Sequence, residues 1–154
     1  MTVVPPVSVA QLLSEPSVAF LELEVAAGAS GIDGRMISTP RSQKPGLALA
    51  GFLPYVKPGP VQILGESESQ FHDTLTASQR VERLLRRVGA GVPSLLSTKG
   101  YRPSPEVHEV CDREGVPSLV TSARTADVIE AVGAFLEDAL APRVQMHGVL
   151  LDVH

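Results

Sequence analysis

Short apolar segments alternate with longer amphipathic segments from Val61 onward, and this alternation constrains the fold more than any other feature. The apolar segments at 61–64, 94–97 and 118–120 have the length of strands. The segments between them carry apolar residues at helical spacing. Because strands that alternate with helices favour a parallel sheet, we expect an α/β fold with a small, mostly parallel sheet flanked by helices.

Local signals mark where the helices of this region begin and end. Thr76, with Gln79 three residues later, has the pattern of a capping box. Ser104 before Pro105 is typical of a helix start, and Gly115 is typical of a helix end. Together with the apolar stripes, these signals predict helices over 76–88, 104–115 and 125–140.

The first sixty residues have a less regular pattern. We expect a short helix over 7–15, a strand with one wet face over 20–25, and another strand over 36–38. The Pro- and Gly-rich stretch over 39–60 contains PGLALAGF, which fits either a buried strand or a short helix. Near the other end, the apolar segment 148–153 is expected to begin a further strand.

Charge and hydropathy argue against two classes of partner. The net charge is −4, and the one basic cluster fits a solvated helix face better than a phosphate-binding surface; its members are Arg80, Arg83, Arg86 and Arg87. No apolar run is long enough to span a membrane, and the N-terminus lacks the pattern of a signal peptide. The single cysteine, Cys111, suits a reducing cytoplasm and a buried helix position. We therefore expect a cytoplasmic protein that binds neither nucleic acid nor membrane.

The histidines and carboxylates form no recognisable catalytic or metal-binding set. None of the four histidines has a partner at metal-ligand spacing. We expect His72 in a loop and His108 on the partly exposed side of a helix, both in structural roles. Glu137 and Asp138 are neighbours on a predicted helix and therefore point apart. No Gly-x-x-x-x-Gly-Lys-Ser/Thr phosphate loop occurs, so we predict no cofactor-binding and no metal-binding residue.

Two longer segments resemble the HPr kinase/phosphorylase family. The first is PGLALAGF at 45–52, followed by VQILG at 61–65 and Glu68. The second is LAPRVQMHGVLLDV at 140–153. The order of the predicted elements between them also fits, so the resemblance covers nearly the whole chain.

The resemblance implies how the chain is organised. Residues 1–142 would form the N-terminal domain of the family, with an α/β fold similar to that of the Mur ligase N-terminal domain. Residues 143–154 would form the first strand of the C-terminal catalytic domain, whose remainder is absent. The family's phosphate loop lies beyond the His-Gly-Val motif, so this 154-residue piece alone is expected to be inactive.

The resemblance also implies an activity for the intact parent. The family is bacterial and cytoplasmic, and it uses ATP or pyrophosphate with Mg²⁺ to phosphorylate a serine of the carrier protein HPr. It also removes that phosphate, and the balance controls carbon catabolite repression. One catalytic residue of the family carries over to this chain, onto His147, with an expected place near the transferred phosphate.

Two roles for the domain remain open at this point. The first is an accessory or regulatory domain that takes part in assembly of a homo-oligomer, a hexamer in the intact parent, with HPr bound through the catalytic domain. The second is a free-standing module of the same fold that senses a small ligand.

Overall fold

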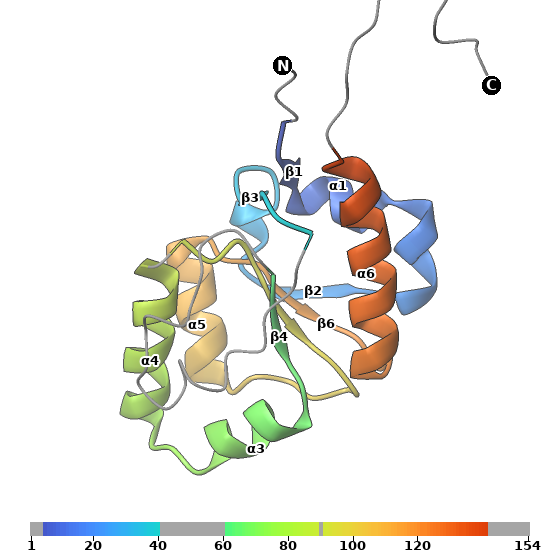
Figure 1. The fold of residues 1–154 in the computed structure, drawn as a ribbon. Helices are drawn as coiled ribbons and strands as arrows, with labels where there is room; N and C mark the ends of the chain where they lie inside the picture. The colour runs from blue at the N-terminus through green and yellow to red at the C-terminus, as the bar shows by residue number, and fades with distance from the viewer. Residues whose placement is uncertain (1–4, 41–60, 90, 142–154) are drawn as a thin grey trace, which may run out of the picture.

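The computed structural model describes residues 5–40, 61–89 and 91–141, and in these the helices lie on both faces of a small sheet (Figure 1). The expectations for PGLALAGF at 45–52, for the strand at 148–153 and for His147 lie outside the described residues.

Within the described ranges, the central sheet has four strands and is mostly parallel, as the alternation of segments predicts. In spatial order the strands are β2 (Glu24–Ala27), β6 (Ser118–Val120), β5 (Leu95–Ser97) and β4 (Gln62–Leu64). The last three run parallel to one another, whereas β2 pairs with β6 in the antiparallel sense. A separate antiparallel pair joins β1 (Val7–Ser8) to β3 (Met36–Ile37).

The three helices predicted after Pro60 are confirmed. The helices and 3-10 helices of the described residues are α1 (Val9–Ser14), η1 (Pro16–Leu21), η2 (Ala29–Gly31), α3 (Glu66–Asp73), α4 (Ala77–Gly89), α5 (Pro105–Glu114) and α6 (Thr125–Ala139). The capping box of α4 forms as expected, because the backbone N–H of Gln79 donates to Thr76 Oγ1 at 3.2 Å and the backbone N–H of Thr76 donates to Gln79 Oε1 at 2.9 Å. In this part of the chain, no helix is both long and apolar enough to cross a membrane.

The strand expected over 20–25 begins later than its alternating pattern suggests. Phe20 and Leu21 close the 3-10 helix η1, and the strand starts at Glu24. Pro16 suits the first helical position, and the Glu15 carboxylate accepts a hydrogen bond from the backbone N–H of Ser17. A proline start and a side-chain cap therefore override the alternation of apolar and acidic residues. Similarly, the helix expected over 7–15 begins only at Val9 because the residues before it pair as β1.

The helix α3 was not predicted, and the loop position expected for His72 is wrong. The sequence ESESQFHD has no apolar stripe, so hydropathy gives no helical signal. In the structure the inward side of α3 carries two polar residues four apart, Glu68 and His72, and both are buried.

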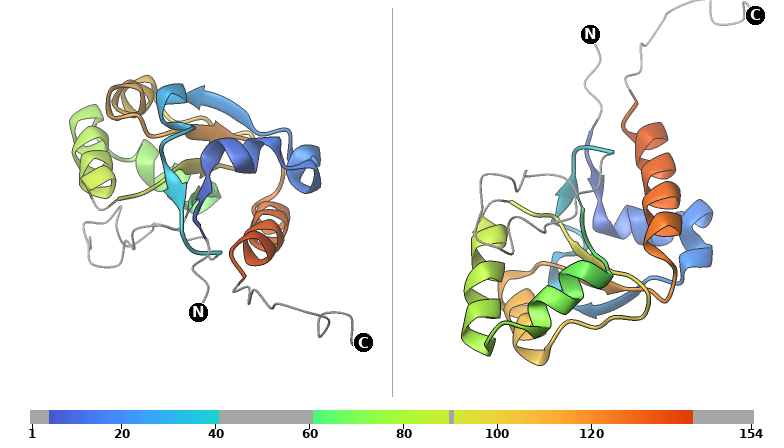
Figure 2. Two further views of the ribbon diagram at one scale, coloured as in Figure 1. Left: turned by 90° about the horizontal axis from the view of Figure 1, so that it is seen from above. Right: turned by 60° about the horizontal axis from the view of Figure 1, so that its bottom comes forward.

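One face of the central sheet, which we call the α6 face, receives only apolar side chains from the three parallel strands. The middle residues of these strands stand in register, and they are Ile63, Leu96 and Leu119. They belong to the same core cluster as Val128, Val132 and Leu136 of α6 and as residues of α1 and η1. Figure 2 shows α6 and α1 on this side of the sheet, opposite α4 and α5.

The other face, which we call the α4–α5 face, mixes apolar and polar side chains. Leu64 and Leu95 pack here against residues of α4 and α5, among them Leu84, Val107 and Cys111. Cys111 is therefore a buried apolar contact, as its helical position predicts. Because side chains alternate along a strand and registered neighbours share a face, Gln62, Ser97 and Ser118 also belong to this face.

Candidate functional site

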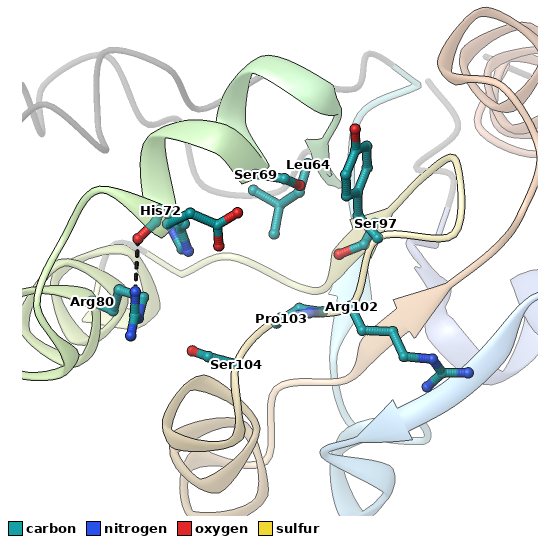
Figure 3. A pocket seen from close by; sticks show the side chains of 10 residues that line it. Leu64, Ser69, His72, Arg80, Ser97, Arg102, Pro103 and Ser104 are labelled. Carbon is teal, nitrogen blue, oxygen red and sulfur yellow. Dashed lines mark hydrogen bonds between the residues drawn. The ribbon is translucent and has the colours of Figure 1, made fainter.

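A small pocket lies where the carboxyl ends of β4 and β5 meet the segments that follow them. Leu64 is the last residue of β4, and Ser97 is the last residue of β5. The pocket is closed by α3 on one side and by the loop that leads into α5 on the other (Figure 3). Its volume is about 50 Å³. The parallel strands β4 and β5 end side by side here, so the residues at their carboxyl ends form one wall of the pocket.

Arg80 lines the pocket and bonds to several of the elements around it. Its Nε and Nη2 each lie 2.7 Å from Glu106 Oε1 at the start of α5. Its Nη1 donates to the carbonyl oxygens of His72 at 2.9 Å and Leu75 at 2.8 Å. The side chains of Arg80 and Glu106 are only 19% and 25% exposed. One guanidinium therefore ties α3, α4 and α5 together around the pocket.

The expectation that the arginines of α4 form a solvated face is wrong for Arg80, but it holds for Arg86. The Arg86 guanidinium pairs with Glu82 one helical turn away, and the two side chains are 51% and 63% exposed. Arg83 stacks over the ring of Phe71, with 6.0 Å between its guanidinium carbon and the ring centroid. Helical spacing alone does not separate a tertiary arginine from a solvated one, because the partner Glu106 lies on another element.

Glu106 itself is held in its ionised form. Its own backbone N–H donates to its carboxylate and lowers the pKa of the group, and the hydrogen bond from Arg80 lowers that pKa further. The nearby Ser104 hydroxyl also lowers the pKa of Glu106. A carboxylate at the N-terminal end of α5 is favourable because it faces the positive end of the helix.

Hydroxyl groups dominate the rest of the lining. Ser69 comes from α3, and Ser97 and Ser104 come from the end of β5 and the start of α5. Ser97 is 1% exposed, and its Oγ has no hydrogen-bond partner among the residues that the structure describes. Figure 3 shows this hydroxyl pointing into the space between α3 and the loop before α5.

Charged groups at the mouth of the pocket are largely paired. Arg102 lines the pocket, and its guanidinium bonds to the carboxylate of Glu24 on β2. Asp73 lies at the end of α3 and contributes a carboxylate. Tyr101 adds an aromatic ring with a hydroxyl group to the same wall.

His108 stands on α5 and is partly exposed, as predicted. Burial lowers the pKa of its imidazole, the negative charge of Asp112 raises that pKa, and the positive charge of Arg102 lowers it. The net effect is a pKa below the usual value, so this side chain is held neutral at physiological pH.

The histidines and carboxylates were the candidate metal ligands and acid–base groups of the sequence. No group of three His, Cys, Asp or Glu side chains in them is arranged to hold a metal ion. Glu137 and Asp138 are exposed on α6, as expected of a solvated face. Sequence reasoning missed the pocket because serines carry no distinctive local pattern. The one available signal was position, since Ser97 ends a predicted parallel strand.

The described residues form an α/β domain with a small polar pocket at the carboxyl ends of β4 and β5. The chain belongs to the family described as HPr Serine kinase N terminus, whose model matches residues 7–136. The resemblance seen in the sequence is thereby confirmed.

Curated relatives agree with this assignment. The HPr kinase/phosphorylase of Geobacillus kaustophilus (strain HTA426) is 33% identical over 133 residues, which are 86% of this chain and 42% of that protein. The HPr kinase/phosphorylase of Geobacter sulfurreducens is 35% identical over 133 residues, 86% of this chain and 41% of that protein. The chain thus matches less than half the length of these relatives.

A solved structure of the CBS and DRTGG domains of the regulatory region of Clostridium perfringens pyrophosphatase, complexed with diadenosine tetraphosphate, is also similar. Its TM-score is 0.49 and its sequence identity 14%, and the match covers 78% of this chain and 45% of that chain.

Proposed function

We propose that this chain supplies the N-terminal, accessory domain of a bifunctional HPr kinase/phosphorylase. The observation that carries the proposal is the family match over residues 7–136, together with relatives that bear that name. The parent enzyme would use ATP or pyrophosphate with Mg²⁺ in the cytoplasm to phosphorylate HPr on serine and to remove that phosphate, and so control carbon catabolite repression. The domain's own part would be assembly of the homo-oligomer, a hexamer in the parent, and regulation.

The described residues do not fit ATP or Mg²⁺. They offer no three-ligand metal cluster, and the 154-residue sequence contains no phosphate loop. The two arginines of the pocket, Arg80 and Arg102, are already engaged by Glu106 and Glu24. We therefore assign phosphoryl transfer, and the binding of HPr, to a catalytic domain and not to these residues.

We place the border of that catalytic domain at residue 143. The segment LAPRVQMHGVLLDV supports this border by its resemblance to the family, and it makes residues 1–142 the accessory domain and 143–154 the first catalytic strand.

His147 would then stand near the transferred phosphate. In the full-length enzyme, His147→Ala should lower both the kinase and the phosphorylase rate by roughly 10²-fold, the usual contribution of a general acid–base or electrostatic group. Unchanged rates in both directions would leave His147 with a structural role.

A domain exchange tests the proposed accessory role. The part of the Geobacter sulfurreducens relative that matches this chain is replaced by residues 1–142, and the oligomer is measured by light scattering coupled to gel filtration. We expect the chimera to assemble as the parent does and to keep both activities. Two controls are needed: the relative without any N-terminal domain, and a chimera whose core is broken by Leu96→Ser. Both should assemble poorly.

A second arm of the experiment uses the 154-residue chain alone with HPr, ATP and Mg²⁺. We expect no phosphorylation above a reaction without enzyme. Phosphorylation by the chain alone, or a chimera that assembles no better than the relative without the domain, would overturn the proposed accessory role.

A further inference from the structure

The pocket at the ends of β4 and β5 has features that an accessory role does not require. We propose that it is a binding site for a small neutral ligand rich in hydroxyl groups, of the size of a three-carbon polyol or the polyol end of a larger molecule. This inference goes beyond the proposed accessory role and does not depend on it.

The buried hydroxyl of Ser97 is the first observation behind the proposal. A buried polar group without a hydrogen-bond partner is unfavourable, and native proteins rarely keep one. Ser97 is 1% exposed, its Oγ is unpaired in the described part of the chain, and it lines the pocket at the end of its strand. A ligand hydroxyl in the pocket would give it a partner.

The balance of charge is the second observation, and it selects against ions. Glu106 already neutralises Arg80, and its carboxylate occupies the N-terminal end of α5. Arg102 is neutralised by Glu24, so an anion would meet no unshared arginine and would face the carboxylate of Asp73. A cation would find only that one carboxylate, beside two guanidinium groups. A neutral ligand avoids both conflicts.

The mixture of donors and acceptors is the third observation. Serine and tyrosine hydroxyls both donate and accept, a carboxylate only accepts, and a guanidinium only donates. Ser69, Ser97, Asp73 and Tyr101 therefore suit vicinal hydroxyl groups, each of which needs one donor and one acceptor. The wall also contains the apolar surfaces of Leu64 and Pro103, against which the carbon atoms of a polyol can pack.

The size of the pocket limits the ligand. A volume of about 50 Å³ is far below the roughly 300 Å³ at which drug-sized pockets begin. A ligand with so few non-hydrogen atoms binds weakly, so we expect a millimolar dissociation constant for a three-carbon probe.

Titration of the ¹⁵N-labelled chain with glycerol, followed through its backbone amide signals, tests the proposal. We expect saturable shifts that centre on Ser97 and on the pocket side of α3. Ser97→Ala should raise the dissociation constant about fivefold, the equivalent of one hydrogen bond. Asp73→Ala, as a second variant, should also weaken binding. The matched control is Ser118→Ala: Ser118 has a buried hydroxyl unpaired among the described residues but does not line the pocket, so glycerol binding should not change.

Three further probes at equal ionic strength make the test decisive: inorganic phosphate, methylammonium chloride and 1-propanol. The last has three carbons but one hydroxyl, so it should bind more weakly than glycerol. Saturable binding of phosphate or methylammonium at these amides in preference to glycerol would overturn the proposal. So would equal affinity for 1-propanol, shifts that grow linearly and spread over the surface, or an unchanged affinity in Ser97→Ala.

Discussion

The two faces of the central sheet are built from the same three strands but have different chemistry. On the α6 face, the registered residues Ile63, Leu96 and Leu119 are all apolar and fully buried. On the α4–α5 face, Gln62, Ser97 and Ser118 share the strands with leucines. The α6 face therefore stabilises the fold by apolar burial without any cost of polar desolvation. On the α4–α5 face, the buried polar groups reduce the stability gained from apolar burial.

The difference shows where this fold can carry a site. Polar groups concentrate on the α4–α5 face. The pocket lies at the carboxyl ends of β4 and β5, where the chain continues into α3 and α5. The α6 face offers no such space at these strands because α6 and α1 cover it with apolar side chains. Substitutions on or beside each face should test this difference between the two faces.

The largest effect is expected from placing a hydroxyl on the α6 face. Leu96→Ser removes a fully buried side chain and leaves a polar group among apolar neighbours. The free energy of unfolding should fall by about 4 kcal/mol, the sum of a cavity and an unpaired hydroxyl. Urea unfolding measures it, and Leu96→Met, which conserves volume, should cost less than about 1.5 kcal/mol. A loss below that value for Leu96→Ser would mean that the α6 face tolerates polar groups too.

A close backbone contact beside the α4–α5 face should be the next most sensitive point. A Cβ on Gly31 would lie 1.8 Å from the carbonyl oxygen of Gly115, which belongs to the backbone and cannot move aside easily. Gly31→Ala should therefore cost about 2–3 kcal/mol. Gly133 on α6 is the control: nothing lies within 4 Å of its added Cβ, so Gly133→Ala should stabilise by about 0.5–1 kcal/mol through helix propensity. Thermal unfolding of both variants gives the comparison, and equal effects would contradict it.

The bonds of Arg80 should contribute more to the free energy of unfolding than the exposed pair of Arg86 and Glu82 on the same helix. Arg80→Met removes the bonds to Glu106 and to two carbonyl oxygens, and should cost about 1.5 kcal/mol. Arg86→Met breaks only an exposed pair within α4 and should cost less than about 0.5 kcal/mol. Chemical unfolding distinguishes them. If the two variants lose the same stability, Arg80 is no more than a surface residue.

Removal of an unpaired hydroxyl from the α4–α5 face should stabilise the protein. Ser118→Ala deletes a buried Oγ that is unpaired among the described residues, so the free energy of unfolding should rise by up to about 1 kcal/mol. Thr121→Val is the matched contrast, because the Thr121 hydroxyl donates to the carbonyl of Leu21 at 2.5 Å and accepts from the N–H of Ala123 at 3.1 Å. That variant should lose about 1 kcal/mol. Opposite signs in urea unfolding support the distinction between the two hydroxyls.

The smallest effect concerns pH and His108. The pKa of this imidazole is lower in the folded chain than its ordinary value of 6.5, so the unfolded chain binds more protons as the pH falls through that value. Stability should therefore decline on acidification from about pH 7.5 to 5.5. His108→Gln should flatten this decline, measured as the difference in urea midpoint between the two pH values. A slope identical to that of the original chain would assign the decline to other groups.

The sequence by itself determined much of the secondary structure. The Thr76–Gln79 capping box, Pro105 and Gly115 act within one turn of the chain, and each fixes a helix end where expected. Short apolar segments that alternate with helical segments were enough to predict a mostly parallel sheet. The family, too, was visible in the sequence, because the motifs that carry the resemblance are contiguous.

Only the tertiary structure decided which polar residues are buried and what they meet. The helix α3 has no apolar stripe, and it is held in the fold by contacts that no local pattern encodes, such as the bond from Arg80 to the His72 carbonyl. Glu106 lies 26 residues from Arg80 in the sequence, so helical spacing could not pair them. The pocket arises because β4 and β5 align their carboxyl ends, which brings Ser97 beside α3. Helix ends and strand patterns depend on near neighbours along the chain, whereas a site depends on neighbours that only packing brings together.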